Sequence, residues 1–100
     1  MKKTIKILLV EDDRNLGFIL KSFLTMKGFP TVLCLDGQEA LEHFENEAFD
    51  FVITDVALSG LDGFSLAEKI KRFDKEVPLV FLRSKSSSFV MSFIFCKHQG

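Results

Sequence analysis

The sequence predicts a single α/β domain built on a doubly wound parallel sheet. Short apolar runs alternate with segments of helical periodicity, and the connections between them are short. Two of the runs, residues 7–10 and 51–54, consist of four consecutive apolar or β-branched residues. Such runs are typical of strands that are buried on both faces of a parallel sheet. A length of 100 residues suits one domain with one core.

The elements of this fold can be placed in order along the chain. Four strands are expected, at residues 4–10, 31–35, 51–54 and 79–82. The first helix lies between Asp13, which caps it, and Gly28, which ends it. Two further helices are expected at residues 38–47 and at about residues 64–73. The apolar positions at helical spacing, which we expect to face the core, are Leu16, Ile19, Leu20, Phe23, Leu24, Ala40, Leu41, Phe44, Leu66, Ala67, Ile70 and Phe73.

The composition disfavours several classes of protein. The residues are 47% hydrophobic and 27% charged with a net charge of −1, so there is no basic surface for nucleic acid. No segment is long enough to span a bilayer, and the first apolar run stops at Glu11 without a cleavage site. We therefore expect a cytoplasmic protein with no membrane partner. Cys34 is expected to be a buried free thiol, and with only Cys96 beside it a disulfide is disfavoured.

After Leu82 the character of the chain changes. A polar stretch at residues 83–88 precedes a dense apolar run at residues 89–96. We therefore expect a domain at residues 1–85 and an atypical apolar tail at residues 86–100. The tail fits either a last strand or a buried helical stretch. The polar stretch is too short for a crossover, so a strand here should pair antiparallel with the fourth strand. An apolar segment of this kind also fits a homodimer interface.

Carboxylates follow two of the predicted strands. Glu11 and Asp12 come directly after the first strand, and Asp55 ends the third. The carboxyl ends of parallel strands meet at one edge of the sheet, where ligands bind in open α/β folds. Oxygen ligands of this type suit Mg²⁺. The structural alternatives are capping and turn roles for Glu11 and Asp12, and a strand-end turn for Asp55.

Four motifs in this order resemble the receiver domain of bacterial two-component response regulators: residues 7–13, 53–55, 61–63 and 77–82. The resemblance covers about residues 4–85. It implies a flavodoxin-like fold with strand order 2-1-3-4, followed here by an incomplete or atypical fifth element. It also implies that one aspartate accepts a phosphoryl group from a sensor histidine kinase or phosphotransfer protein.

The resemblance assigns roles to individual residues. Asp55 matches the phosphoacceptor. Asp12 matches the direct Mg²⁺ ligand, and Glu11 matches its acidic neighbour. Ala57 matches the position whose backbone carbonyl also binds the metal, and Asp62–Gly63 match the turn before the third helix.

The chain departs from the family after the fourth strand. Arg83 occupies the switch position, which is Thr or Ser in the family, and the family's active-site Lys lies beyond the matching region. Lys97 follows an apolar run, as that Lys does, but at a different distance. Three roles are open for Arg83. It can hold a phosphoryl oxygen, it can form a salt bridge with Asp55 or Asp12, or it can extend into solvent.

These features lead to one function hypothesis and two alternatives. The leading hypothesis is a receiver without an attached output domain, which is not itself an enzyme and accepts a phosphoryl group on Asp55 with Mg²⁺. The first alternative is a degenerate or truncated receiver that acts as a protein-interaction or dimerisation module. The second is a Mg²⁺-dependent phosphatase, which is disfavoured because Ala57 stands where that class usually carries a second acid.

Overall fold

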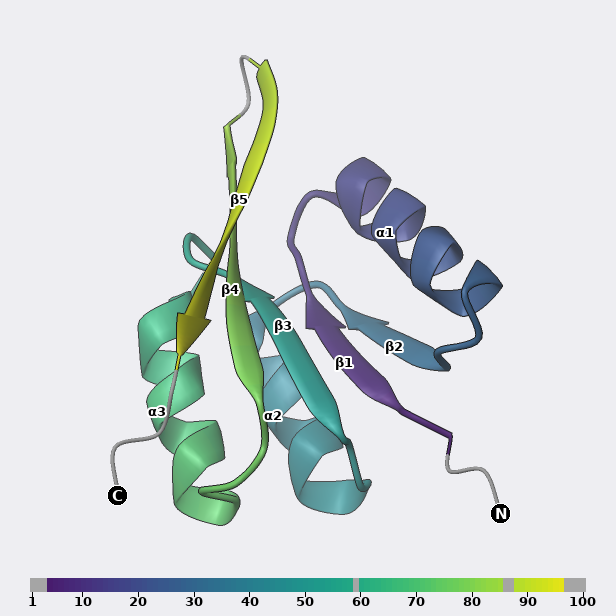
Figure 1. Cartoon of the computed structure of the whole chain (residues 1–100). Coiled ribbons are helices and arrows are strands. Elements are labelled where there is room, and N and C mark those ends of the chain that lie inside the picture. Colours follow the sequence, from purple (N-terminus) through teal and green to yellow (C-terminus); the bar gives the residue numbers. More distant parts are fainter. Residues whose placement is uncertain (1–3, 59, 86–87, 97–100) are drawn as a thin grey trace.

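The computed structural model describes residues 4–58, 60–85 and 88–96, with side chains described as far as Leu82. The described part of the chain forms a five-stranded sheet and three helices, in which strands and helices alternate up to the fourth strand (Figure 1). The elements are β1 (Ile7–Val10), α1 (Arg14–Met26), β2 (Thr31–Cys34), α2 (Gly37–Asn46), β3 (Phe51–Asp55), α3 (Gly63–Phe73), β4 (Leu79–Lys85) and β5 (Ser88–Cys96). Each predicted element is present, with ends that differ by up to three residues.

The strands lie in the order β2-β1-β3-β4-β5. The pairs β1–β2, β1–β3 and β3–β4 are parallel, whereas β5 pairs antiparallel with β4. This arrangement confirms the predicted doubly wound sheet with strand order 2-1-3-4. The apolar tail is a strand and has the expected direction. β4 extends three residues beyond the predicted end at Leu82 because β5 continues to pair with it, Arg83 lying opposite Ser92.

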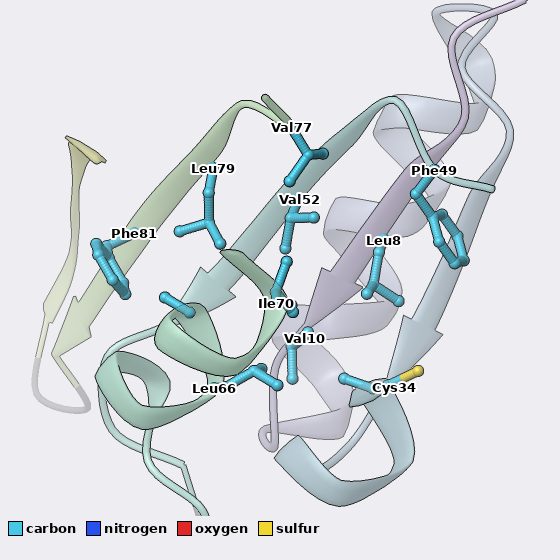
Figure 2. Close-up of a cluster of buried hydrophobic side chains, with 12 residues drawn as sticks. Leu8, Val10, Cys34, Phe49, Val52, Leu66, Ile70, Val77, Leu79 and Phe81 are labelled. Atoms are coloured by element: carbon cyan, nitrogen blue, oxygen red, sulfur yellow. The ribbon is translucent and has the colours of Figure 1, made fainter. Parts of the chain in front are cut away.

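Helices cover both faces of the sheet, but unequally. On one face α2 and α3 lie side by side, and α1 lies on the other (Figure 1). The larger part of the core is under α2 and α3, where side chains of β1, β3 and β4 meet Leu66 and Ile70 of α3 (Figure 2). The smaller cluster, under α1, contains Ile7, Leu9 and Ile53. Successive strand residues alternate between these two clusters, as the strand geometry requires.

Three of the apolar positions expected in the core are exposed instead. On α1, Ile19 is 61% exposed and Phe23 is 53% exposed, because this helix packs on the sheet through the face that carries Gly17, Leu20 and Leu24. On α3, Phe73 is 59% exposed, since it is the last helical residue and Val77 fills the core at that end of the sheet. Among the described helices, none is both long enough and apolar enough to cross a bilayer.

Each of the three described helices is preceded by an aspartate whose side chain accepts hydrogen bonds from backbone amides of the first turn. As predicted, Asp13 caps α1: its Oδ1 accepts from the amides of Asn15 and Leu16, at 3.0 and 3.2 Å. The carboxylates of Asp36 and Asp62 cap α2 and α3 in the same way. These caps satisfy amides that have no partner within the helix.

We expect the substitution Asp13→Ala to lower the free energy of unfolding by about 1 kcal/mol, because two helix amides lose their acceptor. Urea denaturation followed by circular dichroism measures this change. The substitution Asp13→Asn, which keeps a capping oxygen, should recover most of the loss. An equal loss in both variants would mean that the carboxylate charge, rather than the cap, is what stabilises this end of α1.

Candidate functional site

The carboxyl ends of β1 and β3 bring three acidic residues together. Val10 of β1 lies opposite Thr54 of β3, so the residues that follow them, Glu11 and Asp55, are neighbours at one edge of the sheet. Backbone pairing continues to this point, since the Glu11 amide donates to the carbonyl of Cys34 at 3.0 Å. One carboxylate oxygen from each of Glu11, Asp12 and Asp55 lies within 4.8 Å of the others. We call these three residues the acidic cluster.

The members of the acidic cluster differ in exposure. Glu11 is 1% exposed and Asp55 is 5% exposed, whereas Asp12 lies in solvent. Two carboxylates are therefore held close together at low exposure, with a third at the mouth of the site. Like charges at this spacing repel one another, and burial removes the water that would screen them. A bound cation would relieve both costs.

The hydrogen bonds of the cluster leave one buried oxygen without a partner. Oε2 of Glu11 accepts from the amide of Asp13 at 3.0 Å, and Oδ1 of Asp55 accepts from the amide of Ala57 at 3.2 Å. Oε1 of Glu11 is buried and has no hydrogen-bond partner. A buried acceptor without a partner is costly and requires an explanation. A hard divalent cation such as Mg²⁺ fits this donor set, which consists only of oxygens.

The electrostatics of the site favour protonation when no metal is bound. Burial is the main cause that raises the pKa of Glu11 to about 8; the nearby charges of Asp55 and Asp12 contribute to this rise, and the hydrogen bond from the Asp13 amide opposes it. Burial also raises the pKa of Asp55, although the hydrogen bond from the Ala57 amide opposes that shift. The metal-free cluster therefore holds a proton that a divalent cation would displace.

The loop between β3 and α3 approaches the cluster very closely at Gly63. The Gly63 amide donates to the carbonyl of Val56 at 3.0 Å, which ties the start of α3 to the end of β3. A Cβ atom at position 63 would lie 2.1 Å from the carbonyl oxygen of Asp55. Only glycine fits here without movement of the backbone, so Gly63 positions the strand end that carries Asp55.

The remaining predicted site residues are placed in part. Ala57 is exposed and its amide bonds to Asp55, whereas its role as a carbonyl ligand stays a prediction. Arg83 belongs to β4, but its side chain is not among those described, so its three predicted roles stay predictions. Lys97 lies outside the described residues. Sequence reasoning did not single out the contact of Gly63 with Asp55. Its signals in the sequence were the match of Asp62–Gly63 to the family's turn and a glycine at the first position of a helix.

Comparison with known proteins agrees with this geometry. The family model described as the response regulator receiver domain matches residues 7–95. The chain therefore belongs to the receiver domain family of two-component response regulators.

Individual relatives extend this result. The transcriptional regulatory protein RprY of Bacteroides fragilis is 36% identical over 86 residues, which cover 86% of this chain and 36% of that protein. The non-phosphorylated HemR receiver domain of Leptospira biflexa is 35% identical with a TM-score of 0.77, over 85% of this chain and 68% of that one. The response regulator TrrA of Thermotoga maritima was solved in complex with Mg²⁺ and BeF. It is 30% identical with a TM-score of 0.78, over 84% of this chain and 73% of that one.

The match is to one part of these relatives. The chain spans about a third of the length of the curated relatives it matches, several of which are described as transcriptional regulators. The comparisons give no support for the expected homodimer through the C-terminal apolar segment. In the structure, the backbone of that segment pairs with β4 of the same chain.

Proposed function

We propose that this receiver domain accepts a phosphoryl group on Asp55 from a histidine kinase or a phosphotransfer protein, in a Mg²⁺-dependent reaction. The observation that carries the proposal is the acidic cluster, in which a nearly buried Asp55 faces a buried oxygen of Glu11 that has no partner. The proposal places the domain in the cytoplasm, together with the kinase domain that would phosphorylate it.

The reaction transfers the phosphoryl group between two nucleophiles. An oxygen of the Asp55 carboxylate attacks the phosphorus of a phosphohistidine, the P–N bond breaks, and its electron pair stays on the imidazole, which takes up a proton. The product is an acyl phosphate on Asp55. The hydrogen bond from the Ala57 amide to Oδ1 holds the carboxylate in a fixed orientation, which favours attack.

The cluster would hold Mg²⁺ through the carboxylates of Asp12 and Asp55, with Glu11 beside them. When bound, the ion supplies positive charge that offsets the repulsion between a carboxylate and a phosphoryl group. Glu11 is too buried to remain charged at low cost without such an ion.

Phosphorylation by a small phosphodonor tests this proposal. The purified chain is incubated with acetyl phosphate and Mg²⁺ and its intact mass is measured. We expect the mass of one phosphoryl group to be added, and to be absent with Asp55→Asn or with excess EDTA. Asp13→Asn is the matched control, because it removes a neighbouring carboxylate, keeps the cap of α1 and should be phosphorylated as the wild type is.

Lack of any mass gain in the wild-type chain would favour the alternative function, an interaction module without phosphotransfer. One observation supports that alternative: the outward face of α1 exposes the large apolar side chains of Phe18, Ile19, Phe23 and Met26. A phosphorylated Asp55→Asn variant would contradict the assignment of the acceptor instead.

A further inference from the structure

A second group of metal-ligating side chains lies away from the acidic cluster. Cys34 ends β2, and Glu39 and His43 lie one turn apart on α2. One potential ligand atom from each of the three lies within 4.8 Å of the others. Cys34 is fully buried beneath α2, at the end of β2 beside the core (Figure 2), whereas Glu39 and His43 are partly exposed. The group is therefore closed on the core side and open to solvent on the other.

The two sites lie on opposite faces of the sheet. Cys34 packs with Leu8 and Val10 in the core cluster under α2 and α3. Leu9 packs on the α1 side of the sheet, and Glu11, two residues later, points to the same side. A Cβ atom at Gly17 of α1 would accordingly lie 3.5 Å from the Cβ of Glu11. A cation at Cys34 would thus be separate from one at the acidic cluster.

Neighbouring residues already hold two of the three side chains in place. Oε1 of Glu39 accepts from the amide of Leu35 at 3.0 Å, which draws the carboxylate toward the end of β2. Nδ1 of His43 lies 2.5 Å from Oε2 of Glu47, whose other oxygen bonds to Lys6 at 2.7 Å. Because Nδ1 is engaged, Nε2 is the nitrogen left to bind a ligand. A carboxylate on the far nitrogen of a histidine is the usual support of a metal-bound imidazole.

We propose that Cys34, Glu39 and His43 form a site for a zinc ion or a cation of similar softness, with water as the fourth ligand. Thiolate, imidazole and carboxylate are the three ligand types that zinc takes in proteins, and the thiolate selects against Mg²⁺. Tetrahedral zinc with bonds of about 2.0–2.3 Å requires ligand atoms about 3.5 Å apart. The ligand atoms lie within 4.8 Å of one another, so binding would require the partly buried side chains of Glu39 and His43 to move closer to Cys34.

The charges around Cys34 also favour a cation. Burial raises the pKa of this thiol to about 12, and the carboxylates of Glu39, Asp36 and Glu47 contribute to that shift. A divalent cation at this position would reduce the repulsion among the three carboxylates.

Titration with Co²⁺, a spectroscopic substitute for zinc, tests the site. The full chain is titrated in excess Mg²⁺, which occupies the acidic cluster and has no thiolate preference. We expect a thiolate-to-cobalt charge-transfer band in the near ultraviolet that saturates at one equivalent and disappears when zinc is added. The band should remain in Asp12→Asn, which alters only the acidic cluster, and in Cys96→Ser, which removes the other cysteine.

Variants at the proposed ligands decide the outcome. Cys34→Ala should abolish the band, and His43→Gln and Glu39→Gln should each weaken binding at least tenfold. The last two positions are only partly buried, so these variants remain informative even if Cys34→Ala fails to fold. A wild-type chain without the band, or a band that His43→Gln and Glu39→Gln leave unchanged, would overturn the proposal.

Discussion

The substitution Gly63→Ala should lower the free energy of unfolding by about 3 kcal/mol or more and should impair the acidic cluster. The added Cβ would lie 2.1 Å from the carbonyl oxygen of Asp55 and 3.0 Å from Cα of Val56, and both are backbone atoms. Backbone atoms at a strand end cannot rotate away as a side chain does, so β3 and α3 must separate. That separation displaces the residue expected to be phosphorylated.

Gly17→Ala is the matched control, because Gly17 is also a buried glycine in a helix. Its Cβ would approach Cδ1 of Leu33 at 2.9 Å, but that atom is the end of a flexible side chain. Alanine also stabilises a helix interior relative to glycine by about 1 kcal/mol, so the net change should be within about 1 kcal/mol.

Urea denaturation of both variants, together with phosphorylation by acetyl phosphate, measures these effects. We expect Gly63→Ala to lose stability and phosphorylation together, while Gly17→Ala keeps both. If Gly63→Ala were as stable as the wild type, the close packing of α3 against the end of β3 would not be a feature of the protein in solution.

The sheet and the edge that carries the acidic cluster could be predicted because both depend on local sequence patterns. Apolar runs of four residues define β1 and β3, and each run is followed directly by a carboxylate. Once the strands are parallel and adjacent, Glu11 and Asp55 must lie side by side. The direction of β5 followed in the same way, from a connection too short for a crossover.

Properties that depend on the closeness of packing could not be predicted. The helical periodicity of α1 is apolar on more than one face, and it does not show that Ile19 and Phe23 are left uncovered by neighbouring elements. The same holds for the contact between Gly63 and Asp55, and for the approach of His43 to Cys34. The spacing of Glu39 and His43, four residues apart on one helix, was the only local signal for the second site.

Glu11→Gln should stabilise the metal-free protein at neutral and higher pH. Burial raises the pKa of Glu11 from its ordinary value of 4.5 to about 8, so the folded state holds this proton more tightly than the unfolded state does. The wild type therefore loses stability as the pH rises from about 4.5 to about 8. Glutamine keeps the shape and an acceptor oxygen for the Asp13 amide but never ionises, so the variant avoids this loss.

The expected gain for Glu11→Gln is about 2–4 kcal/mol at pH 8 in EDTA and less than about 0.5 kcal/mol at pH 4, measured by urea denaturation. Glu45→Gln, which removes the same charge from an exposed position on α2, should change stability by less than about 0.5 kcal/mol at either pH. A gain that did not depend on pH would mean that packing, and not ionisation, limits stability at Glu11.

Saturating Mg²⁺ should reduce the advantage of the variant, because the ion compensates the buried charge in the wild type, whereas the neutral amide binds it less tightly. The stability that the metal-free protein loses when Glu11 ionises and the affinity of the cluster for a cation thus have the same cause, the burial of this carboxylate.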